Sequence, residues 1–295
     1  MKNICLEVVT VIKKCVCGFA VLSASFLCAF DWPQDAVLSD SFYSYFGQYR
    51  GGTISSSLVF SDYSAVKAVD DGQMMIFVSE HDNDMGWFNS TLGNAVVILH
   101  ADDLMTVYGN LDSEEVAENI TRLEAVHTGT PLGSSGNSGW SQGKSCLEFQ
   151  VIDTRQHTSV NPRILMPRIG KEIPLETGSL SVISKSGSSS AVWNQMTLIA
   201  GQYYFYRSVQ KKAIPYKTSV SINGARVETI SYDSLKQKDM RLCVLGNKLY
   251  PVETVYPDNS RQLIADITLS PGKNVLTVTD ILGAEKTADY VLYVR

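Results

Sequence analysis

The feature that most constrains the fold is a succession of short apolar runs, each bounded by residues that favour turns. Examples are Ala95–Leu99, Thr106–Tyr108 and Val220–Val227, the last of which contains an Asn-Gly pair. Runs of this length are typical of strands, and Asn-Gly between two alternating runs is the strongest short-range signal of a β-hairpin. The pattern therefore predicts a chain that is mainly β.

Strand signals dominate the second half of the chain. Ala200–Tyr206 and Pro271–Val278 each begin with a turn that contains glycine and continue into β-branched or aromatic residues. Such residues fit a pleated, half-buried surface. Several strands at short spacing predict an immunoglobulin-like β-sandwich over residues 168–295.

The first half contains the one stretch with clear helix signals. It spans residues 113–120, where a capping serine is followed by acidic residues. Residues 129–139 are rich in glycine and serine and predict a loop. After that loop, Leu147, Phe149 and Val151 alternate with polar neighbours, which predicts a half-buried strand.

Length and composition indicate a folded protein of two domains. The 295 residues exceed the usual size of one hydrophobic core, and 44% of them are hydrophobic while 19% are charged. We place the domains at residues 31–167 and 168–295. The net charge of −5 argues against a generic affinity for nucleic acid or anionic membrane surfaces, because both require an excess of lysine and arginine. We therefore expect no nucleic-acid partner.

The first 30 residues have the pattern of a secretory signal peptide. Lys2, Lys13 and Lys14 precede a nearly uncharged apolar run from Cys15 to Phe30. The run is too short to cross a bilayer comfortably, and a polar segment follows it. We therefore expect export to the periplasm or cell envelope, removal of residues 1–30, and no retained transmembrane helix.

Most of the cysteines lie in this removable segment. Four of the six are there, namely Cys5, Cys15, Cys17 and Cys28. The mature chain keeps Cys146 and Cys243, which is too few for a disulfide framework, and whether they pair stays open. Cys28 raises the alternative of a lipid anchor, although the residues before it fit a lipoprotein signal poorly.

Five groups of motif residues follow one another between residues 31 and 167. They are Trp32-Pro33; Phe46-Gly47-Gln48-Tyr49-Arg50; Val66-Lys67-Ala68 with Gly72; Gly93-Asn94-Ala95-Val96-Val97-Ile98-Leu99-His100; and Cys146-Leu147-Glu148-Phe149 with Asn161-Pro162. In this order they resemble the LytM (peptidase M23) family, zinc endopeptidases that usually cut peptidoglycan cross-bridges. The resemblance implies an M23/LytM-like antiparallel β-sheet domain with the duplicated hybrid motif fold.

The departures from the family pattern lie at the metal-binding positions. The resemblance places Ser55 and Val59 where the family has the His and Asp of an H-x-G-x-D motif, and Glu148 at the second His of H-x-H. A catalytic zinc normally has three protein ligands of the His, Asp, Glu or Cys type, and valine has no donor atom. We therefore expect no cofactor, although zinc is the metal of the family.

Two histidines that the family uses beside the metal are replaced as well. The resemblance places Asn110 at the His of a Y-x-H-L motif and Cys146 at the first His of H-x-H. General acid–base catalysis and oxyanion stabilisation thereby lose their imidazoles. We expect no catalytic residue, and a groove lined by Ser55, Val59, Asn110, Cys146 and Glu148.

Four further features admit both a chemical and a structural interpretation. Cys146 could be a nucleophile or a small inert residue, and His81-Asp82-Asn83-Asp84 could bind a cation or form an acidic turn. His100 could be a metal ligand or a structural hydrogen-bonding residue, and Tyr203–Tyr206 could stack on sugars or belong to a core strand. In each case we favour the structural interpretation.

Three hypotheses about function follow from the resemblance. The leading one is a non-catalytic cell-envelope protein that binds peptidoglycan or regulates a cell-wall hydrolase, since degenerate members of the family are known to activate cell-wall amidases. The second is an active zinc metalloendopeptidase that acts on peptidoglycan with substitute ligands. The third is a purely structural periplasmic subunit.

Overall fold

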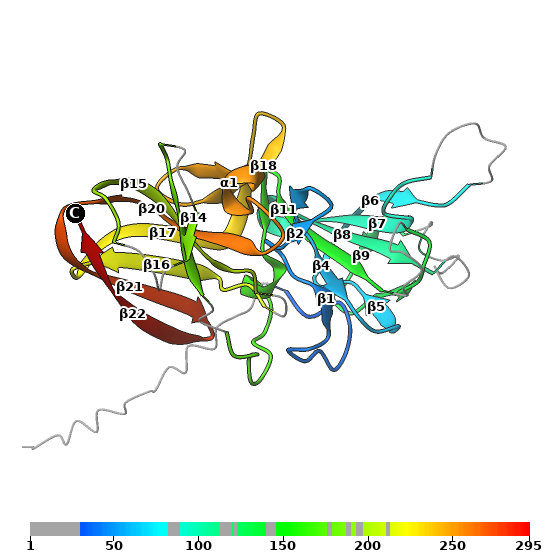
Figure 1. Cartoon of the computed structure of the whole chain (residues 1–295). Coiled ribbons are helices and arrows are strands. Elements are labelled where there is room, and N and C mark those ends of the chain that lie inside the picture. Colours follow the sequence, from blue (N-terminus) through cyan, green and yellow to red (C-terminus); the bar gives the residue numbers. More distant parts are fainter. Residues whose placement is uncertain are drawn as a thin grey trace, which may run out of the picture.

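The computed structural model describes residues 30–81, 89–112, 120, 123–139, 146–175, 179–186, 190–192, 197–210 and 213–295. The predicted signal peptide except Phe30, nearly all of the predicted helix at 113–120, and Asp82, Asn83 and Asp84 lie outside these residues. The described residues form mostly strands in antiparallel sheets (Figure 1). The prediction of a mainly β fold is therefore confirmed.

The first half of the chain forms a twisted antiparallel sheet with smaller pieces packed beside it. Its strands are β1 (Phe42–Ser44), β2 (Tyr49–Arg50), β3 (Thr53–Ile54), β4 (Leu58–Phe60), β5 (Ala65–Lys67), β6 (Gly72–Val78), β7 (Asn94–His100), β8 (Leu104–Leu111), β9 (Ala125–Val126), β10 (Pro131–Ser134), β11 (Glu148–Asp153) and β12 (Thr158–Val160). Short 3₁₀ helices cover Ala101–Asp103 and Pro162–Ile164. The strand predicted from Leu147, Phe149 and Val151 is present, and these three side chains are buried.

One segment that the sequence predicts as a loop contains a strand. Pro131–Ser134 forms β10 and pairs with β5 in an antiparallel register that shifts between Pro131 and Gly133. Leu132, in the middle of β10, is fully buried. The pairing and this burial outweigh the turn-forming composition, because strand formation depends on cross-strand neighbours as well as on local preference. The prediction of a loop throughout residues 129–139 is therefore wrong at these four residues.

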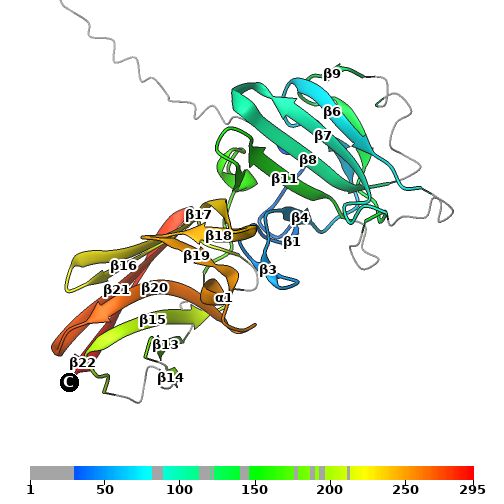
Figure 2. The ribbon, with the colours of Figure 1, turned by 90° about the horizontal axis from the view of Figure 1, so that it is seen from above.

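The second half forms two antiparallel layers with a core between them (Figure 2). Its elements are β13 (Leu180–Ser184), β14 (Ser190–Val192), β15 (Gly201–Ser208), β16 (Lys217–Ile222), β17 (Ala225–Lys238), β18 (Arg241–Leu245), β19 (Leu249–Pro251), α1 (Val252–Val255), β20 (Arg261–Leu269), β21 (Gly272–Leu282) and β22 (Ala284–Val294). One layer has the order β17-β16-β21-β22 and the other β14-β13-β15-β20. The more specific immunoglobulin-like assignment stays a prediction.

The hairpin predicted at Asn223-Gly224 is confirmed. These two residues connect β16 to β17, and both have positive φ, 50° and 83°. A two-residue turn with positive φ at both positions matches the right-handed twist of the flanking strands, which explains the Asn-Gly sequence.

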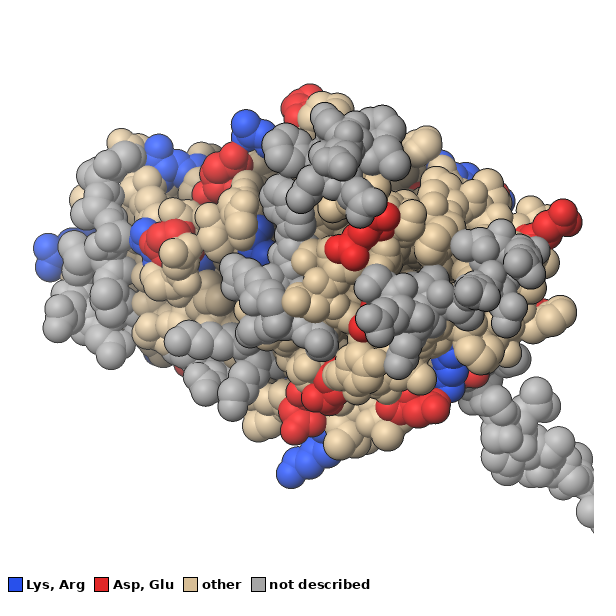
Figure 3. All heavy atoms as spheres, turned by 90° about the vertical axis from the view of Figure 1, so that its right-hand side faces the viewer, with Lys and Arg blue, Asp and Glu red and all other residues tan. Residues whose placement is uncertain are grey.

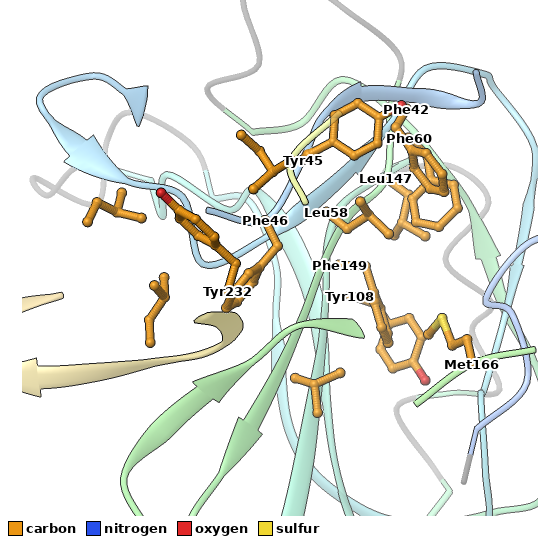
Figure 4. Close-up of a cluster of buried hydrophobic side chains, with 14 of the residues drawn as sticks. Phe42, Tyr45, Phe46, Leu58, Phe60, Tyr108, Leu147, Phe149, Met166 and Tyr232 are labelled. Carbon is orange, nitrogen blue, oxygen red and sulfur yellow. The ribbon is translucent and has the colours of Figure 1, made fainter. Parts of the chain in front are cut away.

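The two halves share one sheet and one core. β12 pairs with β17, so that the sheet continues in the order β22-β21-β16-β17-β12-β11-β8-β7-β6-β9. Tyr232 of β17 belongs to the same buried cluster as Phe46, Leu58 and Phe149 of the first half (Figure 4). Backbone hydrogen bonds and buried side chains therefore both join the halves. The domain boundary at residues 167 and 168 stays a prediction.

A buried arginine also lies where the halves meet. Nη2 of Arg163 donates to both carboxylate oxygens of Glu172, at 2.7 and 2.6 Å. Its guanidinium lies 5.6 Å from the ring centroids of Phe42 and Tyr216 and 5.7 Å from that of Tyr45. Aromatic faces attract a cation, so Arg163 holds residues of both halves together.

Within the described part of the chain, no helix is long and apolar enough to span a membrane.

Candidate functional site

The predicted site residues of β4 and β11 face each other. Val59 lies directly opposite Glu148 in the antiparallel pairing of these strands, and Glu148 also lies opposite Gly109 of β8. Residues directly opposite in such a pair have neighbouring side chains on one face of the sheet. Val59 is buried, whereas Glu148 reaches solvent.

Two serines, Ser55 and Ser57, connect the Val59–Glu148 pair to the chain that follows β3. Ser57 Oγ donates a hydrogen bond to Glu148 Oε1 at 2.8 Å. Ser55 Oγ donates to the backbone oxygen of Ser57 at 3.2 Å and lies 3.3 Å from Ser57 Oγ. Both serines are buried. The structure therefore brings Ser55, Val59 and Glu148 together, with Ser57 between them.

Arg50 completes this group and was not predicted as a site residue. Its Nη1 lies 3.2 Å from Glu148 Oε1, the oxygen that also accepts from Ser57. Arg50 pairs with Thr53 in the β2–β3 hairpin, whose turn residues Gly51 and Gly52 have φ of 59° and 85°. The Gly-Gly pair was the sequence signal for this hairpin, because a two-residue turn of this kind requires positive φ.

Asn110 and Cys146 form a second group next to the first. Asn110 Nδ2 donates to the backbone oxygens of Gly136 and Cys146, at 2.6 Å each, and lies 3.3 Å from Cys146 Sγ. Asn110 Oδ1 accepts from Gly139 N at 2.7 Å. Asn110 has φ of 61°, a left-handed conformation that asparagine tolerates better than most residues. The amide thus connects three chain segments.

This second group has the features of a structural contact. Only 2% of the surface of Asn110 and of Cys146 is exposed. Reactive cysteines are usually partly exposed and lie in electropositive surroundings. Cys146 instead is buried and lies beside the uncharged amide of Asn110. Within the described part of the chain, Cys146 and Cys243 are not joined by a disulfide bond.

The residues at the first group do not fit a catalytic zinc ion. Val59 has no donor atom, and Glu148 is the one carboxylate at these positions, already paired with Arg50. A catalytic zinc needs three protein ligands and one open position. Across the part of the chain that the structure describes, there is no group of three or more His, Cys, Asp or Glu side chains that could hold a metal ion.

His100 makes the structural contacts that the favoured interpretation expects. Its Nδ1 lies 2.9 Å from the backbone oxygen of Asp71, and its Nε2 lies 2.7 Å from Thr106 Oγ1. Burial lowers the pKa of His100 below its ordinary value. A ring that is buried and engaged at both nitrogens holds strands together.

The aromatic run of β15 also has a structural role. Tyr203, Phe205 and Tyr206 are buried, in agreement with the core-strand interpretation. Tyr204 is half-buried, with Lys185 Nζ at 4.7 Å from its ring centroid.

Charged side chains of both signs are interspersed on the face of the molecule shown in Figure 3. Several separate acidic groups are visible there among the described residues. This distribution fits the net charge of −5 and gives no support to a nucleic-acid surface.

Comparison with known proteins assigns the part of the chain that contains most of these site residues, while Arg50 and Ser55 lie before it. Residues 57–162 match the model of peptidase family M23, and this span includes Ser57, Val59, Asn110, Cys146 and Glu148. A second family model, which carries no functional description, matches residues 174–295.

One relative and two solved structures are similar to parts of this chain. An uncharacterized protein of Treponema pallidum (strain Nichols) is 30% identical over 134 residues, which cover 43% of this chain and 88% of that protein. The catalytic domain of the prophage-encoded M23 protein EnpA from Enterococcus faecalis is 22% identical, with a TM-score of 0.32 and coverage of 41% of this chain and 87% of that one. A zinc-containing peptidase from Vibrio cholerae is 18% identical, with a TM-score of 0.36 and coverage of 48% and 41%.

The TM-scores are low, so the assignment depends on the family match and not on these structures. Residues 57–162 of this chain are therefore a peptidase family M23 domain.

Proposed function

We propose that this chain is a non-catalytic M23 protein of the cell envelope, which binds peptidoglycan or regulates a cell-wall hydrolase and uses no zinc. The observation that carries the proposal is the contact of Arg50 and Ser57 with the same oxygen of Glu148. At a metal site, that oxygen would face a metal ion. Here a guanidinium and a hydroxyl occupy its immediate surroundings.

The chemistry of the site residues supports the absence of catalysis. Zinc peptidases activate a water molecule by coordinating it to the metal, which lowers its pKa. Ser55, Val59 and Glu148 provide a hydroxyl, a hydrocarbon and a carboxylate that already has a cationic partner. Asn110, at the second group, uses its amide to connect backbone segments, which leaves it unsuited to proton transfer.

The packing of the domain supports a binding role. Leu58, Phe149 and Val151 are fully buried, and the strands β4, β11 and β8 around Glu148 pair in regular register. The hydrophobic core that this domain shares with the second half therefore holds the face that carries Glu148 in place without a structural metal. A partner can bind such a face by shape and hydrogen bonding alone.

The envelope location is part of the same proposal. It is supported by the signal-like pattern of the first 30 residues and by the peptidoglycan chemistry that the family resemblance implies.

Incubation with isolated cell-wall sacculi tests catalysis. We expect the purified protein, supplied with zinc, to release no soluble peptide fragments, because no water is activated. An active M23 peptidase is the matched positive control. Zinc-dependent release of fragments by this chain would overturn the proposal in favour of an active enzyme with substitute ligands.

Sedimentation with the same sacculi tests binding. We expect the protein to be found with the pellet, or else to change the rate at which a purified cell-wall amidase digests the sacculi. If the protein stays in the supernatant and leaves the amidase rate unchanged, the proposal is wrong and a purely structural subunit is the better description.

A further inference from the structure

The charged residues of the chain are divided unequally between its two halves. Residues 31–167 contain 18 acidic and 6 basic residues, whereas residues 168–295 contain 11 acidic and 16 basic residues. The net charge of −5 thus combines an acidic first half with a basic second half. Because an excess of basic residues raises the local concentration of anions, the second half is where a site for an anion is expected.

An open pocket of about 610 Å³ lies at the beginning of this second half. Its walls are residues 168–175, which follow the first half, and residues 282–286, which include the turn from β21 to β22. The walls are closely packed where they meet, because a Cβ at Gly283 would be 2.9 Å from Glu172 Cγ. Pockets that bind small ligands have volumes of about 300–1,000 Å³, so this pocket has room for one.

The inner part of the pocket is apolar. Leu175 and Leu282 line it, and both are buried in a small cluster with Ala213. Ile169 is buried as well, and Ile173 is half-buried. Among the described residues that line the pocket, no side chain carries a hydroxyl or an amide. A peptide would find no such group to replace its hydrogen bonds to water, whereas a hydrocarbon chain needs none.

Three cations line the same pocket. Arg168 and Lys171 are exposed, and neither forms an ion pair with a carboxylate among the described residues. Lys286 Nζ donates to the backbone oxygen of Leu175, which holds this third cation at the pocket. Guanidinium and ammonium groups make strong, charge-assisted hydrogen bonds to carboxylates. The exposed part of the lining therefore suits a carboxylate.

The two acidic residues of the lining do not cancel this positive charge. Glu172 accepts hydrogen bonds from Arg163 Nη2 at both carboxylate oxygens, at 2.7 and 2.6 Å, so a cation outside the lining already compensates it. Glu285 is the one remaining carboxylate of the described lining. The pocket thus combines an excess of positive charge with an apolar interior.

We propose that this pocket binds a fatty acid of medium chain length, with its carboxylate at Arg168 and Lys171 and its hydrocarbon chain against Leu175 and Leu282. The charge of the lining selects an anion, and the apolar interior selects a hydrocarbon chain over a peptide. The proposal goes beyond the proposed function, because the pocket lies outside the residues that match peptidase family M23. It gives the second half a lipid ligand of its own.

Calorimetric titration of the full chain with decanoate, below the concentration at which decanoate forms micelles, tests the proposal. We expect one decanoate to bind per chain. Decanol has the same chain length without the charge and should bind at least about tenfold more weakly, because the charge-assisted hydrogen bonds are lost. Butyrate keeps the carboxylate but buries little hydrocarbon, so it should show no measurable binding.

Two double variants with the same change of charge make the test specific. Arg168→Gln with Lys171→Gln should weaken decanoate binding at least about tenfold and leave decanol binding unchanged. Arg226→Gln with Lys273→Gln removes two exposed cations outside the pocket and should bind decanoate like the wild type. Ala284→Asp, at an exposed lining position, should also weaken decanoate binding, because it adds a negative charge. Thermal unfolding of each variant confirms that it is folded.

Three results would overturn the proposal. One is a wild-type chain that does not bind decanoate, and another is equal affinity of the wild type and the Arg168→Gln, Lys171→Gln variant for decanoate. The third is tighter binding of trileucine with a free carboxyl terminus than of decanoate, which would assign the pocket to a peptide. None of these results depends on whether the chain binds or cleaves sacculi.

Discussion

At the scale of single residues, the site contains a cation that the chain supplies itself. Glu148 could be predicted as a site residue because the family resemblance places it at the second His of the H-x-H motif. Its partner Arg50 could not be predicted, because residues so far apart in the sequence meet only through tertiary structure. Ser57 was missed for the same reason.

His100 should give the stability of the protein a pH dependence. Burial lowers its pKa in the folded state, so the unfolded chain binds a proton more readily. Stability is therefore complete above the unfolded pKa of about 6.5 and decreases as the pH falls below it. Thermal unfolding across this range should show a larger loss for the wild type than for His100→Gln. Parallel curves for the two proteins would contradict this role.

At the scale of elements, strands with local signals could be predicted and strands that depend on distant partners could not. β15, β21 and the β16–β17 hairpin follow from their own turn and strand residues. β10 does not, because its pairing with β5 decides its conformation. The local sequence of a strand does not indicate which other strand it pairs with.

Gly47 tests how closely the β2–β3 hairpin packs on Tyr232. Its φ is 86°, and a Cβ would be 2.5 Å from the Tyr232 ring. Gly47→Ala should therefore lower the free energy of unfolding by about 2–3 kcal/mol. Gly51→Ala, with φ of 59° and open space around it, should cost about 1 kcal/mol from backbone strain alone. Chemical denaturation measures the free energy of unfolding of both variants. Equal losses for Gly47→Ala and Gly51→Ala would show that Gly47 is not tightly packed.

The register of β4 and β11 makes the metal positions that the family resemblance implies testable. Ser55→His, Val59→Asp and Glu148→His together should bind one zinc ion per chain, because they restore three ligands around an open position. The control combines Ser55→His and Val59→Asp with Glu148→Ala and should bind zinc much more weakly in calorimetry. A folded triple variant without zinc affinity would show that Ser55 and Val59 are not the ligand positions.

At the scale of the whole molecule, the sequence predicts two β domains, and in the described structure one sheet continues from the first half into the second. Nothing in Thr158–Val160 or in β17 identifies them as partners, since each reads as an ordinary strand of its own half. The shared core around Tyr232 and the Arg163–Glu172 pair strengthen this connection. The arrangement explains how the second half can position a hairpin of the first.

Such a connection should make the two halves unfold together. We expect a single transition, coincident when followed by circular dichroism and by fluorescence. Arg163→Met should shift this transition and lower the free energy of unfolding by about 2–3 kcal/mol, since it removes a buried cation from Glu172 and from three aromatic rings. Two separate transitions in the wild type would contradict a shared core.

Zinc titration of the wild-type protein tests the central claim most directly. A ligand that binds the folded state raises the unfolding temperature, so calorimetry and thermal unfolding should agree. Because Glu148 is paired with Arg50 and Val59 has no donor atom, we predict no stoichiometric zinc binding and an unchanged unfolding temperature. Uptake of one zinc ion per chain, with a clear rise in that temperature, would contradict the account.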